Sequence, residues 1–287
     1  MSGSPQPFGS AHTEQKLAAV SDYLQAFVTA LKFRNFDTVY FDACAGSGSS
    51  TPKVIKGQGH LFDESVIIEG SPLRALNVEP KFGRYIFNDL KLKNVRSLEA
   101  ISRANAHADR IAVTRLPAAE AIEQFCADTN WTKTRAVVFL DPFGISPIKY
   151  TQIEALGKTE AVDLWYLIPV GAMNRQVTNT GRILEQSEEL IDELLGTSAW
   201  REEILAESPR MDLFGEVKAD IQKVGNAEHF EKVAIAQLKK AFKGGVSAKV
   251  MPLGRNGMHE FSLVFACANP NPKANSLALR LANAVLK

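Results

Sequence analysis

Strand-like runs alternate with helix-like segments through the first part of the chain, and this alternation restricts the fold more than any other feature. The strand-like runs are short, apolar and rich in β-branched or aromatic residues: 37–41, 84–88, 110–114, 136–140 and 161–168. Apolar residues recur at helical spacing in the segments 13–32, 94–106 and 117–125. Such an alternation forms a parallel sheet with helices on both faces. The sequence therefore predicts a doubly wound α/β fold.

The end of the chain departs from this alternation. After a helical segment at about 228–242, two strand-like runs, VSAKVMPL and HEFSLVFAC, are joined by Asn256-Gly257, a dipeptide typical of hairpin turns. Five strands and this antiparallel hairpin predict a seven-stranded, mostly parallel sheet, the Rossmann-like arrangement of S-adenosylmethionine-dependent methyltransferases. The run GSGSST lacks the third glycine of a dinucleotide-binding loop and the Gly-Lys-Ser/Thr of a P-loop.

The chain is expected to form one cytoplasmic domain. Residues 1–12 lack the apolar core of a signal peptide and are expected to be a flexible tail, and no stretch is long and apolar enough to span a membrane. Residues 13–287 then form the domain, with a helical insertion at about 176–227. The formal charge is +1, and the three cysteines and five histidines are scattered, so we expect neither disulfides nor a metal site.

The stretch YFDACAGSG places an acid and a glycine turn directly after the first strand. Glycines permit positive φ angles and let a ligand lie against bare backbone. S-adenosylmethionine presents an ammonium, a sulfonium, a ribose diol and an adenine. We therefore expect Asp42 to face the ammonium, and Ala45, Gly46 and Gly48 to lie beside the rest of the donor.

Two acids compete for the ribose hydroxyls. Glu69 follows the run SVII at the conventional distance of about twenty residues from a glycine turn. Asp89 follows RYIFN, and it preserves the count of seven strands because a strand ending at Glu69 would be one too many. We assign the ribose to Asp89, with Glu69 or Asn88 as neighbours of the site. The sequence does not indicate how adenine is bound.

The fourth strand ends in Asp141-Pro142-Phe143-Gly144. Ligands of open α/β sheets bind at the carboxyl ends of the strands, so this loop and the glycine turn should face one crevice. Asp141 and the Asp-Pro carbonyl can accept hydrogen bonds from an exocyclic amine, and Phe143 can stack on a planar base. The loop resembles the D/N-P-P-F/Y signature of amine methyltransferases and is similar to its form in some guanine-N2 tRNA methyltransferases, although the second proline is absent. We expect Gly144 to contact the substrate.

Taken in order, these motifs resemble the three-Cys-motif partner proteins, a family of bacteria and phages. The resemblance rests on the turn at 42–48, GSPLRAL at 70–76, FND ending at Asp89, LDPFG at 140–144, an arginine at 175, ELLGTSAWRE at 193–202 and the final hairpin. It implies a methyltransferase-like fold, S-adenosylmethionine as cofactor, a substrate contact by Arg175, and a protein partner that resembles a radical S-adenosylmethionine enzyme and carries the three cysteines. Cys44 departs from the family, in which this position is commonly aromatic.

Two functions are compatible with these residues. The first is methyl transfer to an amine, on a nucleobase, in cooperation with the partner protein. The second is a non-catalytic nucleotide-binding or scaffolding subunit of a partner complex. Basic residues outnumber acids between Lys81 and Arg115, and this stretch is compatible with a nucleic-acid backbone, although Lys91, Lys93 and Arg96 are more typical of a solvated helix face. Acids dominate between Ile183 and Glu216, which favours a lid or a docking face for a protein.

Overall fold

A computed structural model of the chain describes residues 11–50, 68–211, 217–255 and 257–286. Residues 1–10 of the expected tail therefore lie outside the described residues, as do most of the run between the glycine turn and Glu69 and the turn residue Asn256. The first helix begins at Ala11, two residues before the expected start of the domain.

The central sheet has the strand order β10-β12-β7-β6-β1-β4-β5, and β11 pairs with β12 as well. Its strands are β1 (Asp37–Asp42), β4 (Arg84–Asn88), β5 (Ile111–Thr114), β6 (Thr134–Leu140), β7 (Val162–Ile168), β10 (Gly245–Val246), β11 (Met251–Leu253) and β12 (Phe261–Cys267). The sheet contains five parallel strands in the order β5-β4-β1-β6-β7. Strand β12 is antiparallel to its neighbours β7, β10 and β11. The predicted doubly wound sheet with its closing hairpin is confirmed. The two-residue strand β10 is an addition that is too short for a sequence pattern to reveal.

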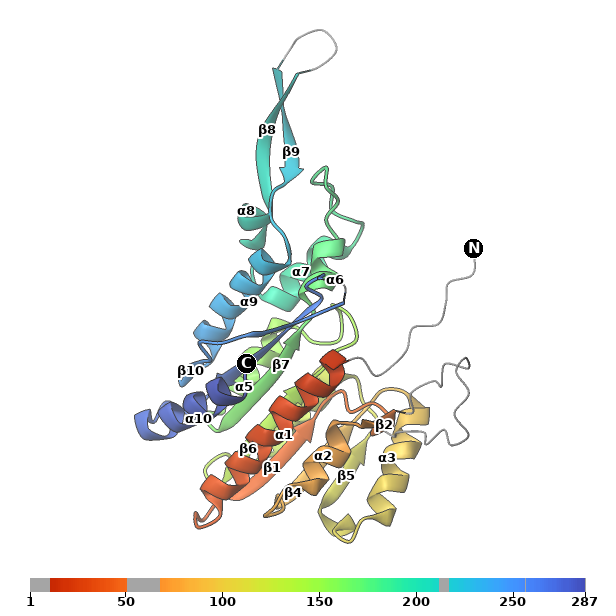
Figure 1. Cartoon of the computed structure of the whole chain (residues 1–287), viewed down its shortest axis with the longest axis vertical. Coiled ribbons are helices and arrows are strands. Elements are labelled where there is room, and N and C mark those ends of the chain that lie inside the picture. The colour runs from red at the N-terminus through yellow and green to blue at the C-terminus, as the bar shows by residue number, and fades with distance from the viewer. Residues whose placement is uncertain (1–10, 51–67, 212–216, 256, 287) are drawn as a thin grey trace.

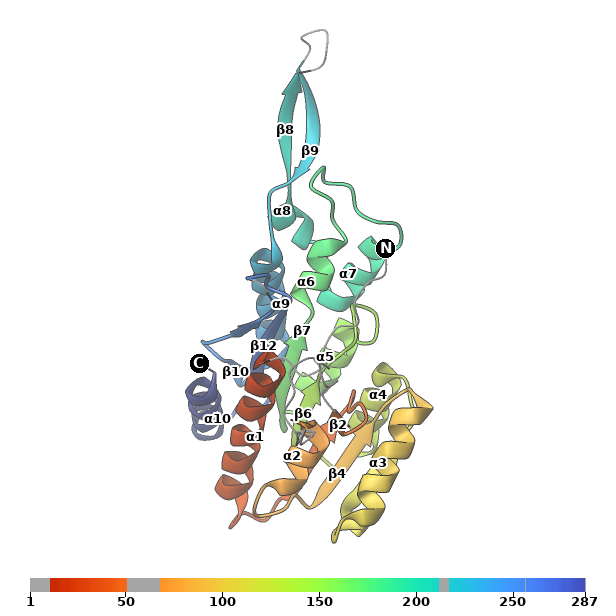
Figure 2. The ribbon, with the colours of Figure 1, turned by 45° about the vertical axis from the view of Figure 1, so that its right-hand side comes forward.

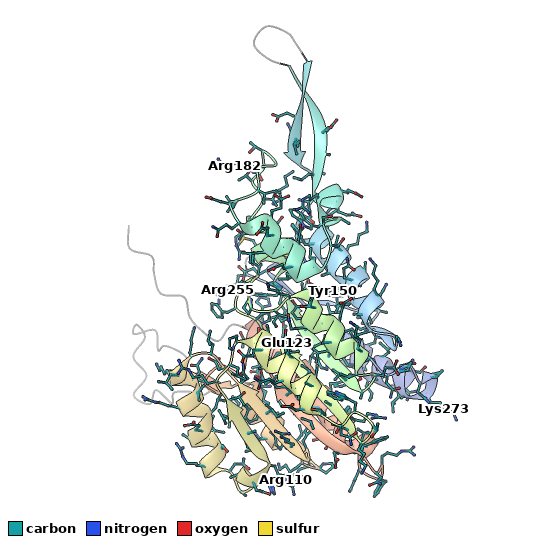
Figure 3. All side chains as sticks on the ribbon, turned by 180° about the vertical axis from the view of Figure 1, so that it is seen from behind. Arg110, Glu123, Tyr150, Arg182, Arg255 and Lys273 are labelled. Atoms are coloured by element: carbon teal, nitrogen blue, oxygen red, sulfur yellow. The ribbon has the colours of Figure 1, made fainter. Side chains whose placement is uncertain are left out.

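Helices cover both faces of this sheet (Figures 1 and 2). One face packs against α1 (Ala11–Leu31), α2 (Ser71–Asn77), α3 (Leu92–Ala104) and α10 (Pro272–Val285). The other packs against α4 (Ala118–Asp128), α5 (Tyr150–Lys158), α6 (Val170–Arg175), α7 (Ser187–Leu195), α8 (Trp200–Ile204) and α9 (Ala227–Ala241). Viewed from behind, Glu123 and Tyr150 mark α4 and α5 on this second face (Figure 3).

The strands are buried on both sides because alternate residues belong to different cores. Phe139 and Trp165 contribute to the α1 side, whereas Val138 and Leu164 contribute to the α5 side. This arrangement explains why the strands are continuous apolar runs and not alternating ones. The sequence analysis did not anticipate α10, whose start is fixed by the Asn271 side chain, which accepts hydrogen bonds from two amides of the first turn.

The insertion between β7 and α9 is not purely helical. Besides α7 and α8 it contains an antiparallel ribbon, β8 (Leu205–Met211) and β9 (Val217–Lys223), which projects away from the sheet (Figure 1). The alternation of apolar and polar residues in VKADIQK is the strand signal that a helical interpretation overlooks. A short 3-10 helix (Ala108–Arg110) and a two-stranded sheet of β2 (Ser49–Ser50) and β3 (Ile68–Glu69) complete the elements.

The acidic helix α7 is held against the body of the protein by ion pairs. Arg201 of α8 lies 2.6 Å from Glu188 and 2.8 Å from Asp192, and Lys149 lies 2.7 Å from Glu193. Part of the acidic excess is therefore neutralised within the insertion. None of the helices in the described part of the chain is long and apolar enough to cross a membrane.

Candidate active site

Three acids follow three adjacent parallel strands. Strand β1 lies between β4 and β6, and Asp42 stands in register with Phe87 and Phe139. Asp89 and Asp141 each come two residues after these partners. The sheet thus brings positions 42, 89 and 141 to the same carboxyl edge, as the sequence predicted.

Asp42 is fully buried and faces donors of the protein itself. Its Oδ2 accepts a hydrogen bond of 2.6 Å from the Ser71 hydroxyl, and its Oδ1 accepts one of 3.2 Å from the Cys44 amide. Burial raises the pKa of Asp42 to about 7, and the hydrogen bond from Ser71 offsets part of this rise. The Asp42 carboxyl therefore has a pKa much nearer to neutral pH than that of an ordinary aspartate. Its contact with a donor ammonium stays a prediction.

The two glycines of the turn have different roles. Gly46 has φ +63°, and no atom of the described residues lies within 4 Å of the position that a Cβ would occupy, so this part of the structure leaves room for a ligand beside the Gly46 backbone. Gly48 has φ +78°, a conformation that favours glycine, and a Cβ there would lie 2.5 Å from Ile101 Cδ1, so the end of the Ile101 side chain on α3 would have to shift. Ala45, between Asp42 and these glycines, is buried and its amide donates to the Asn88 carbonyl at 2.9 Å.

Of the two rival acids, Asp89 belongs to the central sheet. Its strand β4 pairs with β1, and its Oδ2 accepts a 3.0 Å hydrogen bond from the Gly46 amide, which ties it to the glycine turn. Glu69 ends β3, which pairs with β2 in a separate two-stranded sheet, and its exposed carboxylate accepts from Asn77 at 3.2 Å. The central sheet therefore includes the strand before Asp89 and excludes the strand that ends at Glu69, and the assignment of ribose to Asp89 stays a prediction.

Asp141 forms an ion pair that the sequence did not reveal. The ammonium of Lys16, on the first helix, lies 2.5 Å from Asp141 Oδ2, and the Lys16 side chain is only 11% exposed. The same ammonium lies 5.9 Å from the centre of the Phe139 ring. Lys16 stands four residues before Val20 on the apolar face of α1, and a lysine at a buried helical position is the signal that could have indicated this role.

The rest of the loop after β6 presents an aromatic ring to the solvent. Pro142 is buried, but Phe143 is 82% exposed, and the Lys91 ammonium lies 5.3 Å from its ring centre. Gly144 has φ +91°, and within the described ranges no atom lies within 4 Å of its Cβ position. A planar group can therefore reach both Phe143 and the backbone of this loop.

Three buried polar atoms near this edge lack a hydrogen-bond partner among the described residues: His12 Nδ1, Tyr166 Oη and Asn174 Oδ1. His12 lies one helical turn before Lys16, Tyr166 stands beside Leu140 in the sheet, and Asn174 belongs to the helix that follows β7. Burial raises the pKa of Tyr166, so its hydroxyl remains a donor. Because unpaired buried polar groups are costly, they are consistent with a polar ligand at this edge.

Arg175 ends α6 and is exposed. It forms no ion pair or side-chain hydrogen bond with any part of the chain that the structure describes, including the acids of the insertion. Its proposed contact with substrate is therefore untested.

Comparisons with known proteins agree with this architecture. No protein-family model and no curated protein matches the sequence. Among solved structures, a Legionella pneumophila protein assigned to the family DUF519 aligns with a TM-score of 0.52 and 13% identity, over 97% of this chain and 93% of that one. The CcbJ methyltransferase of Streptomyces caelestis aligns with a TM-score of 0.36 and 11% identity, over 89% of this chain and 90% of that one. At that TM-score the similarity is too distant to support an argument about function.

The order of the sheet and the glycine turn after its first strand decide the fold class. The fold is a doubly wound, Rossmann-like one, and the DUF519 protein shares it. In such a fold the carboxyl edge of the sheet is the ligand-binding edge. Asp42, Asp89 and Asp141 all lie there, and so do the two glycines with open Cβ positions, Gly46 and Gly144.

Proposed function

We propose that the protein is an S-adenosylmethionine-dependent methyltransferase that acts on an amine of a nucleobase. The observation that carries this proposal is the meeting of Asp42, Asp89 and Asp141 at the ends of three adjacent parallel strands. The open backbone at Gly46 and the unpaired polar atoms at the same edge fit a bound polar ligand. The order of sequence motifs supports the same proposal through its resemblance to the three-Cys-motif partner proteins.

The donor would be held by the first two strand ends. S-adenosylmethionine, when bound, supplies an electrophilic methyl group on a positively charged sulfur. Asp89 uses its carboxylate to fix the amides of Gly46 and Lys91, at 3.0 and 2.7 Å, and retains acceptor sites for ribose hydroxyls. Asp42 places a partly ionised carboxyl beneath the glycine turn, where an ammonium would favour its charged form.

The acceptor amine would be positioned by the loop after β6. Asp141 and the carbonyl of its peptide bond to Pro142 accept the amine hydrogens and so direct the nitrogen lone pair. Lys16 holds the Asp141 carboxylate in one orientation through their 2.5 Å contact. Phe143 stacks on the base, and this contact contributes about 1–3 kcal/mol in proteins that bind single-stranded nucleic acids. The protein's contribution is therefore position and electrostatics.

Charge at the rim supports nucleic acid as the substrate. Lys91 lies over Phe143, and the exposed side chains of Lys93 and Arg96 continue along α3 from the same corner. These cations can neutralise phosphates beside a stacked base. For the protein partner, a relative of radical S-adenosylmethionine enzymes, we propose the insertion as the docking element, because its ribbon projects from the body (Figure 1).

Two measurements test the proposal. Calorimetry with S-adenosylhomocysteine should show binding to the wild-type chain, and Asp89→Ala should weaken it about tenfold. Radiolabelled methyl transfer to pools of RNA, DNA and partner protein should then label a nucleic acid, and Asp141→Ala should abolish the label. Absence of donor binding would contradict the proposal. Donor binding without transfer to any pool would instead favour a non-catalytic scaffolding subunit.

A further inference from the structure

A cavity lies at the opposite end of the sheet from the candidate active site. It has a volume of about 470 Å³ and is bounded by Phe27 and Leu31 of α1 and by Leu277 and Leu281 of α10. Its floor is Asp163, the second residue of β7, so the cavity lies at the amino ends of the parallel strands. Cavities that bind small molecules are mostly apolar and have volumes of about 300–1,000 Å³.

The acid on the floor is already paired. The Tyr23 hydroxyl donates a 2.6 Å hydrogen bond to Asp163 Oδ2, and the Cys267 thiol is a further hydrogen-bonding neighbour. Burial raises the pKa of Asp163 to about 6 and keeps the Tyr23 hydroxyl protonated. Asp163 already accepts hydrogen bonds from Tyr23 and Cys267, so it does not need a cationic ligand as a partner.

The mouth of the cavity carries cations. Arg34, Arg135 and Lys273 are all lining residues, and the first residues of α10 add the positive end of a helix dipole. The Arg135 guanidinium lies 4.0 Å from the centre of the Phe36 ring. Its Nη1 donates to the carbonyls of Trp131 and Thr134, which leaves the Nε and Nη2 donors without a protein acceptor among the described residues.

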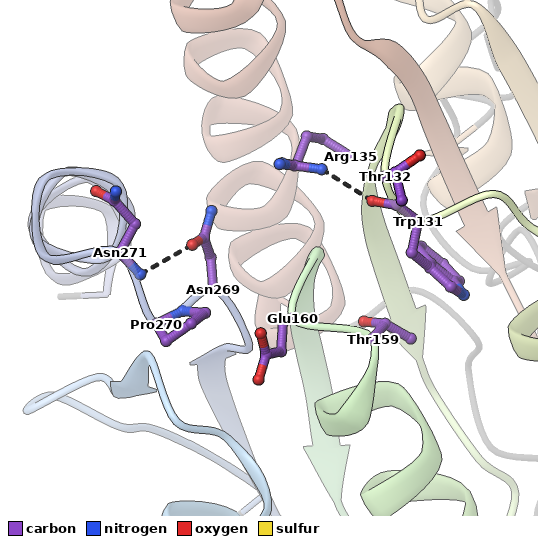
Figure 4. A pocket seen from close by; sticks show the side chains of 8 residues that line it. All are labelled: Trp131, Thr132, Arg135, Thr159, Glu160, Asn269, Pro270 and Asn271. Atoms are coloured by element: carbon purple, nitrogen blue, oxygen red, sulfur yellow. Dashed lines mark hydrogen bonds between the residues drawn. The ribbon is translucent and has the colours of Figure 1, made fainter.

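A recess of about 550 Å³, more polar than this cavity and lined also by Glu160, adjoins it and shares Arg135, Asn269 and Asn271 with it. Figure 4 shows the recess, with the Arg135 guanidinium in front of α1 and Asn269 facing it from the segment before α10. The guanidinium therefore stands where the apolar cavity meets the polar recess. A ligand with one apolar and one anionic end matches this gradient.

We propose that the cavity between α1 and α10 binds an amphipathic carboxylate, with its apolar body between the two helices and its anionic end at Arg135, Arg34 and Lys273. The three cations and the apolar walls select this class over an amine or a neutral alcohol. The site is separate from the proposed donor site, because Asp163 lies at the start of β7 and the donor residues follow the ends of their strands. In the view from behind, Lys273 lies far from Arg182 of the insertion (Figure 3).

Calorimetry on the full chain tests the proposal, with decanoate, decylamine and decanol as probes. Decanoate should bind at least tenfold more tightly than decylamine. Ala30→Trp fills the cavity from the exposed end of α1 and should weaken decanoate binding at least tenfold. Ala104→Trp, at the exposed end of α3, is the matched control and should leave it unchanged.

A second comparison isolates the charged end. The pair Arg34→Gln and Lys273→Gln should weaken decanoate binding about tenfold and leave decanol binding unchanged, whereas Lys239→Gln with Lys240→Gln, on α9, should affect neither. The proposal is overturned if decanoate does not bind, if decylamine binds equally well, or if Ala30→Trp retains full affinity. Gly46→Ala should not alter decanoate binding, so failure of the donor-site proposal would leave this one standing.

Discussion

The ammonium of Lys16 and the carboxylate of Asp141 lie 2.5 Å apart, although 125 residues separate them in the sequence. The contact joins the first helix to the loop after β6. Lys16 holds the Asp141 carboxylate, which in the proposed reaction orients the acceptor amine. Lys16 belongs to α1, which precedes every strand of the sheet.

The Lys16–Asp141 pair should couple measurably in stability. The two side chains are 11% and 32% exposed, so we expect a coupling free energy of about 1–2 kcal/mol, between the values for surface and buried pairs. Urea unfolding of the wild type, Lys16→Met, Asp141→Asn and the double variant measures this coupling free energy. The control cycle on Lys149 and Glu193, which are nearly half-exposed, should give below about 0.5 kcal/mol. Equal coupling in the two cycles would contradict the special position of Lys16.

Asp42 should make the protein less stable as pH rises. Its pKa of about 7 in the folded chain exceeds the ordinary 3.8, so the folded state binds a proton that the unfolded state has lost. This contribution is fully present below about pH 4 and is lost as pH rises to about 7, a change of about 4 kcal/mol. In Asp42→Asn that part of the pH dependence should vanish from urea-unfolding free energies.

Asp163 provides the control for this pH dependence. Burial raises the pKa of Asp163 only to about 6. Its contribution to the free energy of unfolding therefore also decreases as pH rises, but the decrease ends about one pH unit lower than for Asp42. Between pH 6 and 7, Asp42→Asn should therefore flatten the profile more than Asp163→Asn does. The same slope in Asp42→Asn and the wild type over this interval would show that Asp42 is ionised normally in the folded chain.

Gly46→Ala should abolish donor binding at a small cost in stability. The positive φ of +63° disfavours alanine by about 1–2 kcal/mol, but the new methyl group meets no atom of the described residues and points into the space proposed for the donor. Gly257→Ala has the same kind of strain, at φ +76° with open space, but lies at the hairpin turn. Both variants should lose similar stability, and only Gly46→Ala should lose affinity for S-adenosylhomocysteine in calorimetry.

Phe143→Ala should reduce methyl transfer without destabilising the protein. The ring is 82% exposed, so its removal should change the unfolding free energy by less than about 0.5 kcal/mol. Loss of one stacked base should lower the transfer rate at limiting nucleic acid about tenfold. Phe33 is equally exposed and also lies under a lysine, Lys32, so Phe33→Ala is the matched control and should leave transfer unchanged.

Local patterns in the sequence were sufficient to place the strands of the central sheet, apart from β10. The strand at Arg84–Asn88 and the hairpin partners around Asn256-Gly257 follow from periodicity and turn chemistry, which depend only on neighbouring residues. The positions of Asp42, Asp89 and Asp141 at one edge follow from the same patterns, because parallel strands bring their carboxyl ends together.

Other features depended on contacts between distant segments. Pairing of β4 with β1 placed Asp89 beside the central sheet, and packing of the first helix onto the sheet placed Lys16 beside Asp141. The cavity above Asp163 likewise exists only because α1 and α10, from the two ends of the chain, lie together. The sequence alone determined which elements form, since their signals are local. The tertiary structure decided which side chains meet, because those distances depend on how the elements pack.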